Sequence, residues 1–197
     1  MFLRNTRVVG ADLLPPTEAM RHFAFVSSSA TALPFRNRAF SAVSCVDVLE
    51  HLPPEVRGEA IRECVRVAAE MVLMAFPSGP AAQRCDREYH QACTQRGREI
   101  PTWVDEHLRY QYPVAETVAT QIQAAAEASG YSAHIQQSYC EPLSIARVVR
   151  ATAARSTALY AIVNVVLGFL SRLIPQPHAA EGYRTIVVAE LSLRRAT

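Results

Sequence analysis

The sequence predicts an α/β fold, and three apolar runs lead to that prediction. Phe23–Val26 and Ser41–Val46 each stop at polar residues, as the buried strands of a parallel sheet do. A third run, Arg7–Ala11, closes on an acid and a turn. Ligands bind outside the carboxyl ends of the strands in open α/β sheets, so these polar ends should line one crevice.

Composition favours a single globular domain. The chain has 197 residues, of which 50% are hydrophobic and 19% charged, enough for a proper core and unlike a disordered chain. The net charge of +2 is too small to indicate nucleic acid or an anionic surface as a partner. Five cysteines without regular spacing, and no signal peptide, favour a reducing cytoplasm.

Three segments carry a resemblance to a known family. They are Ala30–Phe35 (ATALPF), Phe40–Val43 (FSAV) and Asp47–Leu52 (DVLEHL). In this order and spacing they resemble class I S-adenosylmethionine-dependent methyltransferases, in particular the small-molecule, type 11-like group. The resemblance implies a Rossmann-like three-layer sandwich, mostly parallel, with an antiparallel last strand. It also implies S-adenosylmethionine as cofactor and methyl transfer to a small-molecule or lipid-like acceptor.

The resemblance also implies a cofactor site. Asp12 occupies the position of the acid that accepts hydrogen bonds from the ribose hydroxyls, and capping of the turn before Pro15-Pro16 is the alternative. Ser29 stands where the family has an acid for the adenine amine, and the Ala30 N–H would face the ring. Residues at the ends of the strands should converge there, namely Asp12, Leu13, Ser29, Ala30, Cys45 and Val46.

The glycine-rich loop that the family carries after its first strand is not found. Only six residues precede Arg7, and none of the 7 glycines forms a G-x-G pattern. A late start or a fragment would explain this, and so would a true remnant. We therefore expect cofactor binding by the chain as given to be weak or absent, with Arg7–Ala11 and Ser41–Val46 flanking the gap. The alternative function is a non-catalytic remnant that binds a partner or a membrane surface.

The segment after the third motif predicts a helix that starts at Pro53-Pro54. Val56, Ala60, Ile61, Cys64, Val65 and Ala68 should face the sheet, whereas Arg57, Glu59, Arg62, Glu63 and Arg66 should face water. Met71–Phe76 is predicted to be the next strand. His51 is a candidate general base, and it could equally cap or brace this helix. In the resembled family the Glu50-His51 pair is more often structural.

The connection from residue 79 to 112 is polar and aromatic and predicts two short helices, the second starting near Pro101. Residues 80–112 lie where the family inserts elements that cover the substrate. The set Cys85, Asp86, His90 and Cys93 matches no closed zinc pattern, so no metal site is predicted and solvated helix faces are expected.

The last third predicts a helix over Pro113–Ser129, with Val114, Val118, Ile122 and Ala125 inward, and strands over Tyr131–Tyr139 and Tyr183–Leu193. Residues 143–174 predict one long helix whose second half is too short to span a membrane. We expect an inward stripe and an outward set that would bind a membrane surface or a second copy of the chain. The inward stripe is Leu159, Ile162, Val163, Val166 and Leu170, and the outward set is Val165, Phe169 and Leu173.

Overall fold

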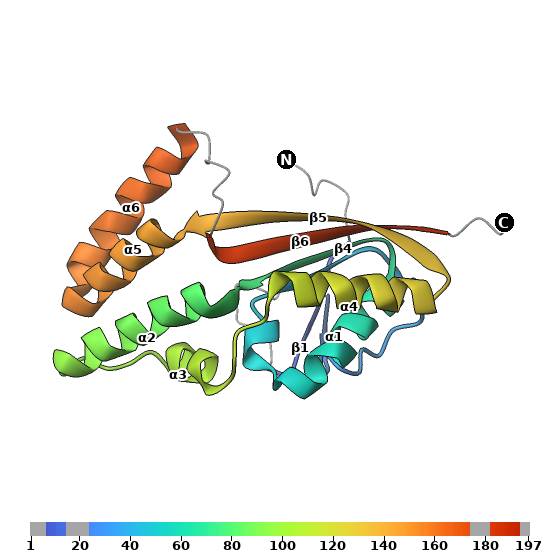
Figure 1. Cartoon of the computed structure of the whole chain (residues 1–197), viewed down its shortest axis with the longest axis horizontal. Helices are drawn as coiled ribbons and strands as arrows, with labels where there is room; N and C mark the ends of the chain where they lie inside the picture. The colour runs from blue at the N-terminus through green and yellow to red at the C-terminus, as the bar shows by residue number, and fades with distance from the viewer. Residues whose placement is uncertain (1–6, 15–23, 174–181, 194–197) are drawn as a thin grey trace.

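The computed structural model describes residues 7–14, 24–173 and 182–193 (Figure 1). Its elements include both strands and helices along the chain, as expected for an α/β fold. The strands are β1 (Val9–Asp12), β2 (Ala24–Ser27), β3 (Phe40–Val46), β4 (Ala68–Pro77), β5 (Tyr131–Pro142) and β6 (Gly182–Leu193). The helices are the 3-10 turn η2 (Leu49–His51), α1 (Pro54–Val67), α2 (Gly79–Gln95), α3 (Thr102–Arg109), α4 (Ala115–Ala128), α5 (Leu143–Arg155) and α6 (Thr157–Leu173).

The strands form two separate sheets. β1 and β2 pair in parallel, and the second sheet has the order β3-β4-β6-β5. β3 is parallel to β4, whereas β6 is antiparallel to both β4 and β5, so β6 alone in this sheet runs against the others. The prediction of an antiparallel last strand is therefore confirmed. Figure 1 shows the two-stranded sheet running at a steep angle to the four-stranded one.

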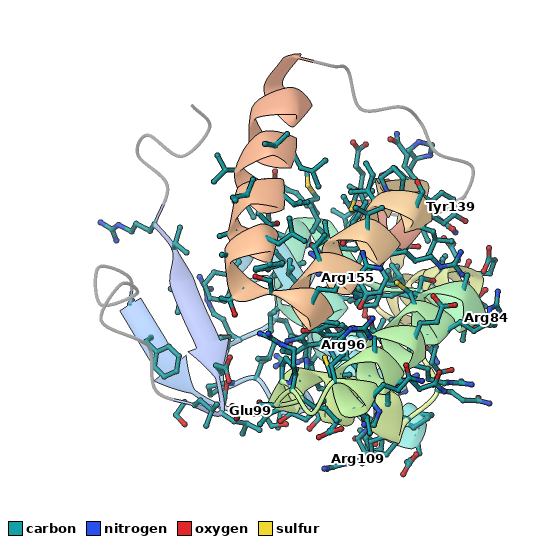
Figure 2. The ribbon with its side chains drawn as sticks, turned by 90° about the vertical axis from the view of Figure 1, so that its left-hand side faces the viewer. Arg84, Arg96, Glu99, Arg109, Tyr139 and Arg155 are labelled. Atoms are coloured by element: carbon teal, nitrogen blue, oxygen red, sulfur yellow. The ribbon has the colours of Figure 1, made fainter. Side chains whose placement is uncertain are left out.

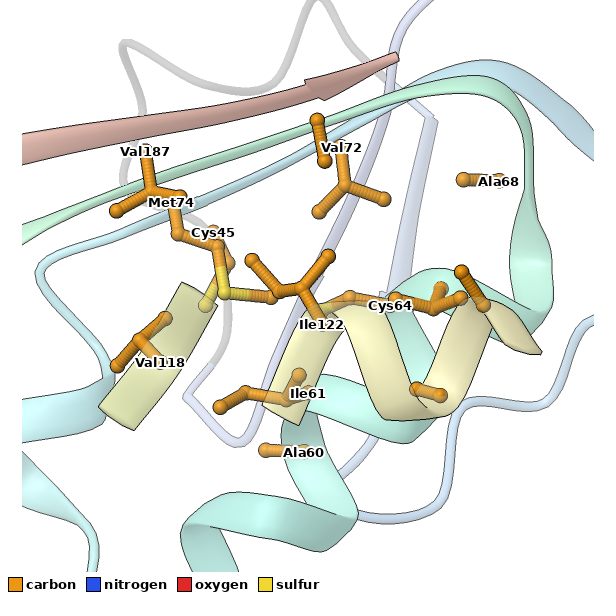
Figure 3. Packing of buried hydrophobic residues seen from close by; sticks show 14 of the residues in the cluster. Cys45, Ala60, Ile61, Cys64, Ala68, Val72, Met74, Val118, Ile122 and Val187 are labelled. Carbon is orange, nitrogen blue, oxygen red and sulfur yellow. The ribbon is translucent and has the colours of Figure 1, made fainter. Parts of the chain in front are cut away.

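The main core lies between the four-stranded sheet and helices α1 and α4. Ile61 from α1 and Ile122 from α4 are completely buried against Met74 and Val187 of the sheet (Figure 3). The cysteines at 45 and 64 are part of this core, as predicted for Cys64. Val114 was predicted to face inward, but it precedes α4 and is 41% exposed.

The opposite face of the four-stranded sheet differs from the expected three-layer sandwich. Figure 1 shows α1 and α4 on one side of the sheet, and no described helix covers the middle of the other side. Val46 and Met71, which point to that other side, are exposed. The physical reason lies in the sequence before α1, where the described residues form three strands and polar turns but no α-helix that could supply the layer.

The polar face of α1 is less solvated than predicted. Arg57 is buried, and it donates hydrogen bonds to the carbonyls of Leu52 (3.1 Å) and Gln111 (2.6 Å). Arg66 binds Glu63 through its Nε (2.6 Å) and reaches the carbonyl of Leu33 (2.9 Å). These side chains fix neighbouring loops to α1, because buried carbonyls at loop ends need donors.

The predicted long helix over residues 143–174 is two helices. Ser156 is extended (φ −161°, ψ 132°), and its Oγ accepts the N–H of Leu159 (3.4 Å), so it ends α5 and caps α6. α6 packs mainly against α5 and not on the sheet. The predicted inward stripe is therefore wrong for Leu159, Ile162 and Val166, which are exposed, whereas Val165 is exposed as predicted.

The side chains of Phe169, Leu170 and Leu173 lie outside the described residues, so the predictions for them stay predictions. None of the described helices combines the length and the hydrophobicity that a membrane-spanning segment needs.

The core predicts a large difference in stability between substitutions at two positions, one in the middle of α4 and one just before it. Ile122→Ala should lower the free energy of unfolding by about 2–5 kcal/mol, because it leaves a cavity between α4 and the sheet. Val114→Ala, at an exposed position, should cost less than about 1 kcal/mol. Urea unfolding of both variants measures the difference, and equal losses would contradict the assigned core.

Candidate functional site

A large cavity lies at the end of the molecule where α2, α3, α5 and α6 meet the ends of three strands. Its volume is about 880 Å³. Figure 2 looks onto this end, with Arg96 following α2 and Arg155 at the end of α5. Aromatic and charged side chains share its lining, which consists of Asp47, Tyr89, Cys93, Arg98, Glu99, Pro101, Trp103, His107, Glu141, Val149, Arg150, Ala153, Thr157, Tyr160, Asn164, Tyr183 and Arg184.

Two acids at this cavity have an unusual backbone. Asp47 (φ 52°) follows β3, and Glu141 (φ 58°) lies near the end of β5. They are two of the three non-glycine residues with positive φ in the described chain. Such conformations cost energy and gather at functional sites. Asp47 pairs with Arg184 (2.9 Å) and Glu141 with Arg150 (3.3 Å), so each acid is held against an arginine.

A buried carboxylate joins the elements around the cavity. Asp86 of α2 is completely buried and accepts hydrogen bonds from the hydroxyls of Tyr112 and Tyr183 (2.7 Å for Tyr183). Arg150 Nε donates to it at 2.8 Å, and His107 Nδ1 lies 3.3 Å away. Solvated helix faces were predicted here. The structure contradicts this prediction, because Cys85, Asp86 and Cys93 are all buried on the inner side of α2.

The electrostatics of this cluster favour an ionised Asp86. Burial opposes ionisation, but the hydrogen bond from His107, the Arg150 charge and the two tyrosine hydroxyls together hold the pKa of Asp86 below its ordinary value. Burial and the neighbouring Asp86 charge raise the pKa of Tyr112, so its phenol stays protonated and serves as a donor. The cluster is therefore a fully bonded ion pair with two phenols.

A second group of titratable residues lies beside the first. Glu50 of η2 is completely buried, and burial raises its pKa to about 7. His107 Nε2 is 3.8 Å from a Glu50 carboxylate oxygen. His51 Nδ1 is 3.0 Å from Glu106, so His51 braces α3 and not the helix that follows it. The cavity lining includes His107 but not His51.

The residues predicted to bind the cofactor divide between the two sheets. Asp12 pairs with Ser27 across β1 and β2, and its carbonyl accepts the Ser28 N–H (2.9 Å). Its carboxylate accepts the N–H of Leu14 (3.0 Å), which is the turn-capping role considered from the sequence. Leu13 is exposed. Ser29 follows in the same turn and bonds the hydroxyl of Thr31 (2.8 Å).

The other members of the predicted set belong to the second sheet or contact it. Ala30 packs against the main core, which contains Cys45. Cys45 is buried toward α1, whereas Val46 is 47% exposed on the other face. No strand pairing joins the two sheets within the described ranges. The structure thus brings Asp12 together with the turn at Ser28, and the convergence of the whole set stays a prediction.

Comparison with known proteins places the sequence motifs in a family. Residues 3–76 match the type 11 methyltransferase domain. The match covers the part of the chain that carries the three motifs ATALPF, FSAV and DVLEHL. The family uses S-adenosylmethionine as its methyl donor. The search of curated proteins found no match.

One of the solved structures that match the chain supports a likeness in fold, and two others match it with lower scores. A chain from the complex between the Trm112 methyltransferase activator and a methyltransferase of Haloferax volcanii matches with a TM-score of 0.53 and 13% identity, over 99% of this chain and 77% of that one. A methyltransferase structure from Bacillus halodurans matches with a TM-score of 0.47 and 15% identity, over 96% and 84%. A S-adenosylmethionine-dependent methyltransferase from Archaeoglobus fulgidus gives 0.46 and 16%, over 92% and 75%.

The Asp86 cluster was not predicted from the sequence, but a signal for it existed. Asp86 lies four residues after Ala82 and three before Tyr89, and all three are on the buried stripe of α2. A charged residue on such a stripe needs a buried partner. Arg150 of α5 is that partner, and nothing local in the sequence connects two residues so far apart.

The buried pair predicts a large loss on replacing Arg150. Arg150→Met should lower the free energy of unfolding by about 3–5 kcal/mol, because Asp86 then keeps a buried charge without its cation. Arg147→Met is the matched control on the same helix, since its partner Glu88 and Arg147 itself are about half exposed. That control should cost at most about 1 kcal/mol. Similar losses in thermal or urea unfolding would contradict a special role for the buried pair.

The clamp between α1 and the ATALPF segment predicts a dependence on acid. The Arg66 hydrogen bond holds the pKa of Glu63 below its ordinary 4.5, and the Leu33 N–H (2.8 Å) adds to it. A depressed folded-state pKa stabilises the fold above pH 4.5, and that contribution is lost as the pH falls below this value. Glu63→Gln should therefore cost about 1–2 kcal/mol at neutral pH and progressively less in acid.

Urea unfolding followed through an acid titration measures this dependence. Glu59→Gln is the control, because Glu59 forms an exposed pair with Arg62 on the same helix. A Glu63→Gln difference that stays constant from neutral pH into acid would contradict the assigned clamp.

Proposed function

We propose that this methyltransferase domain transfers a methyl group from S-adenosylmethionine to a small organic acceptor held in the cavity between α2, α3, α5 and α6. The observation that carries the proposal is the cavity itself. Its volume of about 880 Å³ lies within the usual range for small-molecule sites, about 300–1,000 Å³. Trp103, Tyr160 and Tyr183 give it apolar surface, and the Asp47–Arg184 pair gives it polarity.

The nucleoside end of the donor would contact the carboxyl ends of the strands. Asp12, Leu13, Ser29, Ala30, Cys45 and Val46 remain the proposed contacts. The Asp12 carboxylate and the Ser29 hydroxyl already take part in turns, so they are held in place, and a carboxylate has further lone pairs for a diol. The residues present fit the ribose and adenine end, whereas no G-x-G loop for the amino-acid end occurs in the sequence.

The order of the strands supports the view that the two sheets correspond to one sheet of the methyltransferase family. β1 and β3 are the strands that would flank the family's central first strand, and the described sheet is divided between them. A Rossmann-like sheet that lacks this strand accounts for the division. The affinity of such a sheet for the donor would be low.

Methyl transfer requires mainly that the protein position the acceptor relative to the methyl group. The sulfonium supplies an activated methyl group when it is bound, so the protein has to align an acceptor atom and exclude water. Asp47 and Glu141 are two of the three carboxylates that line the cavity, and either can receive the acceptor's proton. A lipid-like acceptor would extend beyond the cavity along α6, where Ile162 and Val165 are exposed next to the lining residue Tyr160.

A second candidate function is a non-catalytic domain that binds a partner. The observation that favours it is the division of the sheet together with the exposed apolar residues of α6. The two candidates differ in donor binding, since a remnant would have lost it entirely. Sequencing upstream of Met1 also separates them, because an in-frame strand followed by a glycine-rich loop would favour the enzyme.

Donor binding can be tested with S-adenosylhomocysteine by saturation-transfer NMR, which detects weak ligands. We expect transfer to the ribose and adenine protons, and loss of most of the ribose signal in Asp12→Ala. Asp105→Ala, an exposed acid on α3, is the control and should bind as the wild type does. An absence of transfer with the wild-type chain would overturn the enzymatic proposal and favour the remnant. Micromolar affinity by calorimetry would contradict the expected weakness.

A further inference from the structure

Glu50 is buried without a hydrogen-bond partner. Its exposed fraction is 0%, and neither carboxylate oxygen accepts a hydrogen bond from any of the described residues. Burying a carboxylate without compensation costs several kcal/mol or more, and native structures rarely keep such groups without a reason. An unpartnered buried carboxylate therefore indicates that something else satisfies it.

Two histidines surround this carboxylate. His107 Nε2 lies 3.8 Å from Glu50 Oε1, and the ring centroids of His51 and His107 are 4.7 Å apart. One ligand atom from each of the three residues lies within 4.8 Å of the other two. No other set of three or more such side chains in the described ranges meets this condition. The residues come from η2 and α3, so the chain fold, not a local sequence motif, assembles them.

Each histidine also has a carboxylate behind it. His107 Nδ1 faces Asp86 at 3.3 Å, and His51 Nδ1 faces Glu106 at 3.0 Å. A carboxylate on the far nitrogen is the usual support of a metal-binding histidine, because it fixes the tautomer and makes the other nitrogen a better ligand. His107 then presents Nε2 toward Glu50, and His51 keeps its second ring nitrogen.

We propose that Glu50, His51 and His107 bind one divalent first-row transition metal, with Zn²⁺ as the best fit. Two imidazoles and one carboxylate are ligands that such metals accept, and Mg²⁺ or Ca²⁺ would prefer oxygen alone. Zn–N and Zn–O bonds of about 2.0–2.1 Å put tetrahedral ligand atoms roughly 3.3 Å apart. The 3.8 Å separation of His107 and Glu50 is close to this value, so small side-chain movements complete the site.

A metal ion can reach the site from solvent, and the site leaves one coordination position open. The His51 side chain is 31% exposed, which gives a metal a route from solvent, whereas Glu50 is enclosed. Three protein ligands leave a fourth position, as in catalytic and not in closed structural zinc sites. His107 also lines the large cavity, so the metal would lie at its wall. The metal proposal does not depend on the methyltransferase proposal.

The first test is a Zn²⁺ titration of chelator-treated protein by competition with a chromophoric chelator, with Co²⁺ absorption as a spectroscopic readout. We expect one Zn²⁺ per chain, a Co²⁺ spectrum of low coordination number, and no comparable binding of Mg²⁺ or Ca²⁺. His107→Gln and Glu50→Gln should each weaken binding at least tenfold. Glu106→Gln, which removes only the supporting carboxylate, should weaken it by about 10–100-fold.

The matched control is another histidine–carboxylate pair between α2 and α3. His90 Nε2 and Asp105 Oδ1 are 3.4 Å apart at the surface, and His90→Gln should bind Zn²⁺ as the wild type does. Since replacing a buried Glu50 can impair folding, the partly exposed His51→Gln carries the same test, with circular dichroism to confirm its fold. The proposal is overturned if the wild type binds no stoichiometric Zn²⁺, or if His51→Gln and His107→Gln bind it unchanged.

Discussion

The carboxylate of Asp86 is the interaction on which the cavity end of this molecule depends. Removing such a group from water costs several kcal/mol, and only well-placed donors compensate for that cost. Its donors are Tyr112, Tyr183, Arg150 and His107, which belong to the loop before α4, to β6, to α5 and to α3. One buried charge therefore holds five parts of the chain in a common arrangement, and the cavity is the space between them.

The strands were predictable because their signals are local. Each apolar run ended in polar residues, and β3 and β6 lie within a residue of the predicted Ser41–Val46 and Tyr183–Leu193. Helix α4 followed from its spacing in the same way. The antiparallel last strand came from the family resemblance, and the structure has it. Short stretches of sequence were thus largely sufficient to predict which residues form each element.

The predictions that failed concern residues whose environment depends on partners far away in the sequence. Arg57 has the sequence surroundings of a surface residue, but Gln111 provides a buried carbonyl that its guanidinium satisfies. Asp86 needed Arg150, and the stripe on α6 needed a sheet that α6 does not reach. The break at Ser156 was missed because apolar residues continue on both sides and neither proline nor glycine marks it. Local sequence patterns predict that a segment is helical, but they do not predict the surface against which the helix packs.

Helix α3 brings the two proposed sites together. It has only 8 residues, fewer than the roughly 12–15 that an isolated helix needs, so its position depends on tertiary contacts. His107 of α3 contacts Asp86 and Glu50, Glu106 contacts His51, and the Trp103 ring stacks on Tyr89. A metal held by Glu50, His51 and His107 would fix this helix to η2, and η2 directly follows the carboxyl end of β3. Because Trp103 and His107 both line the cavity, the ion would set the shape of the proposed acceptor site.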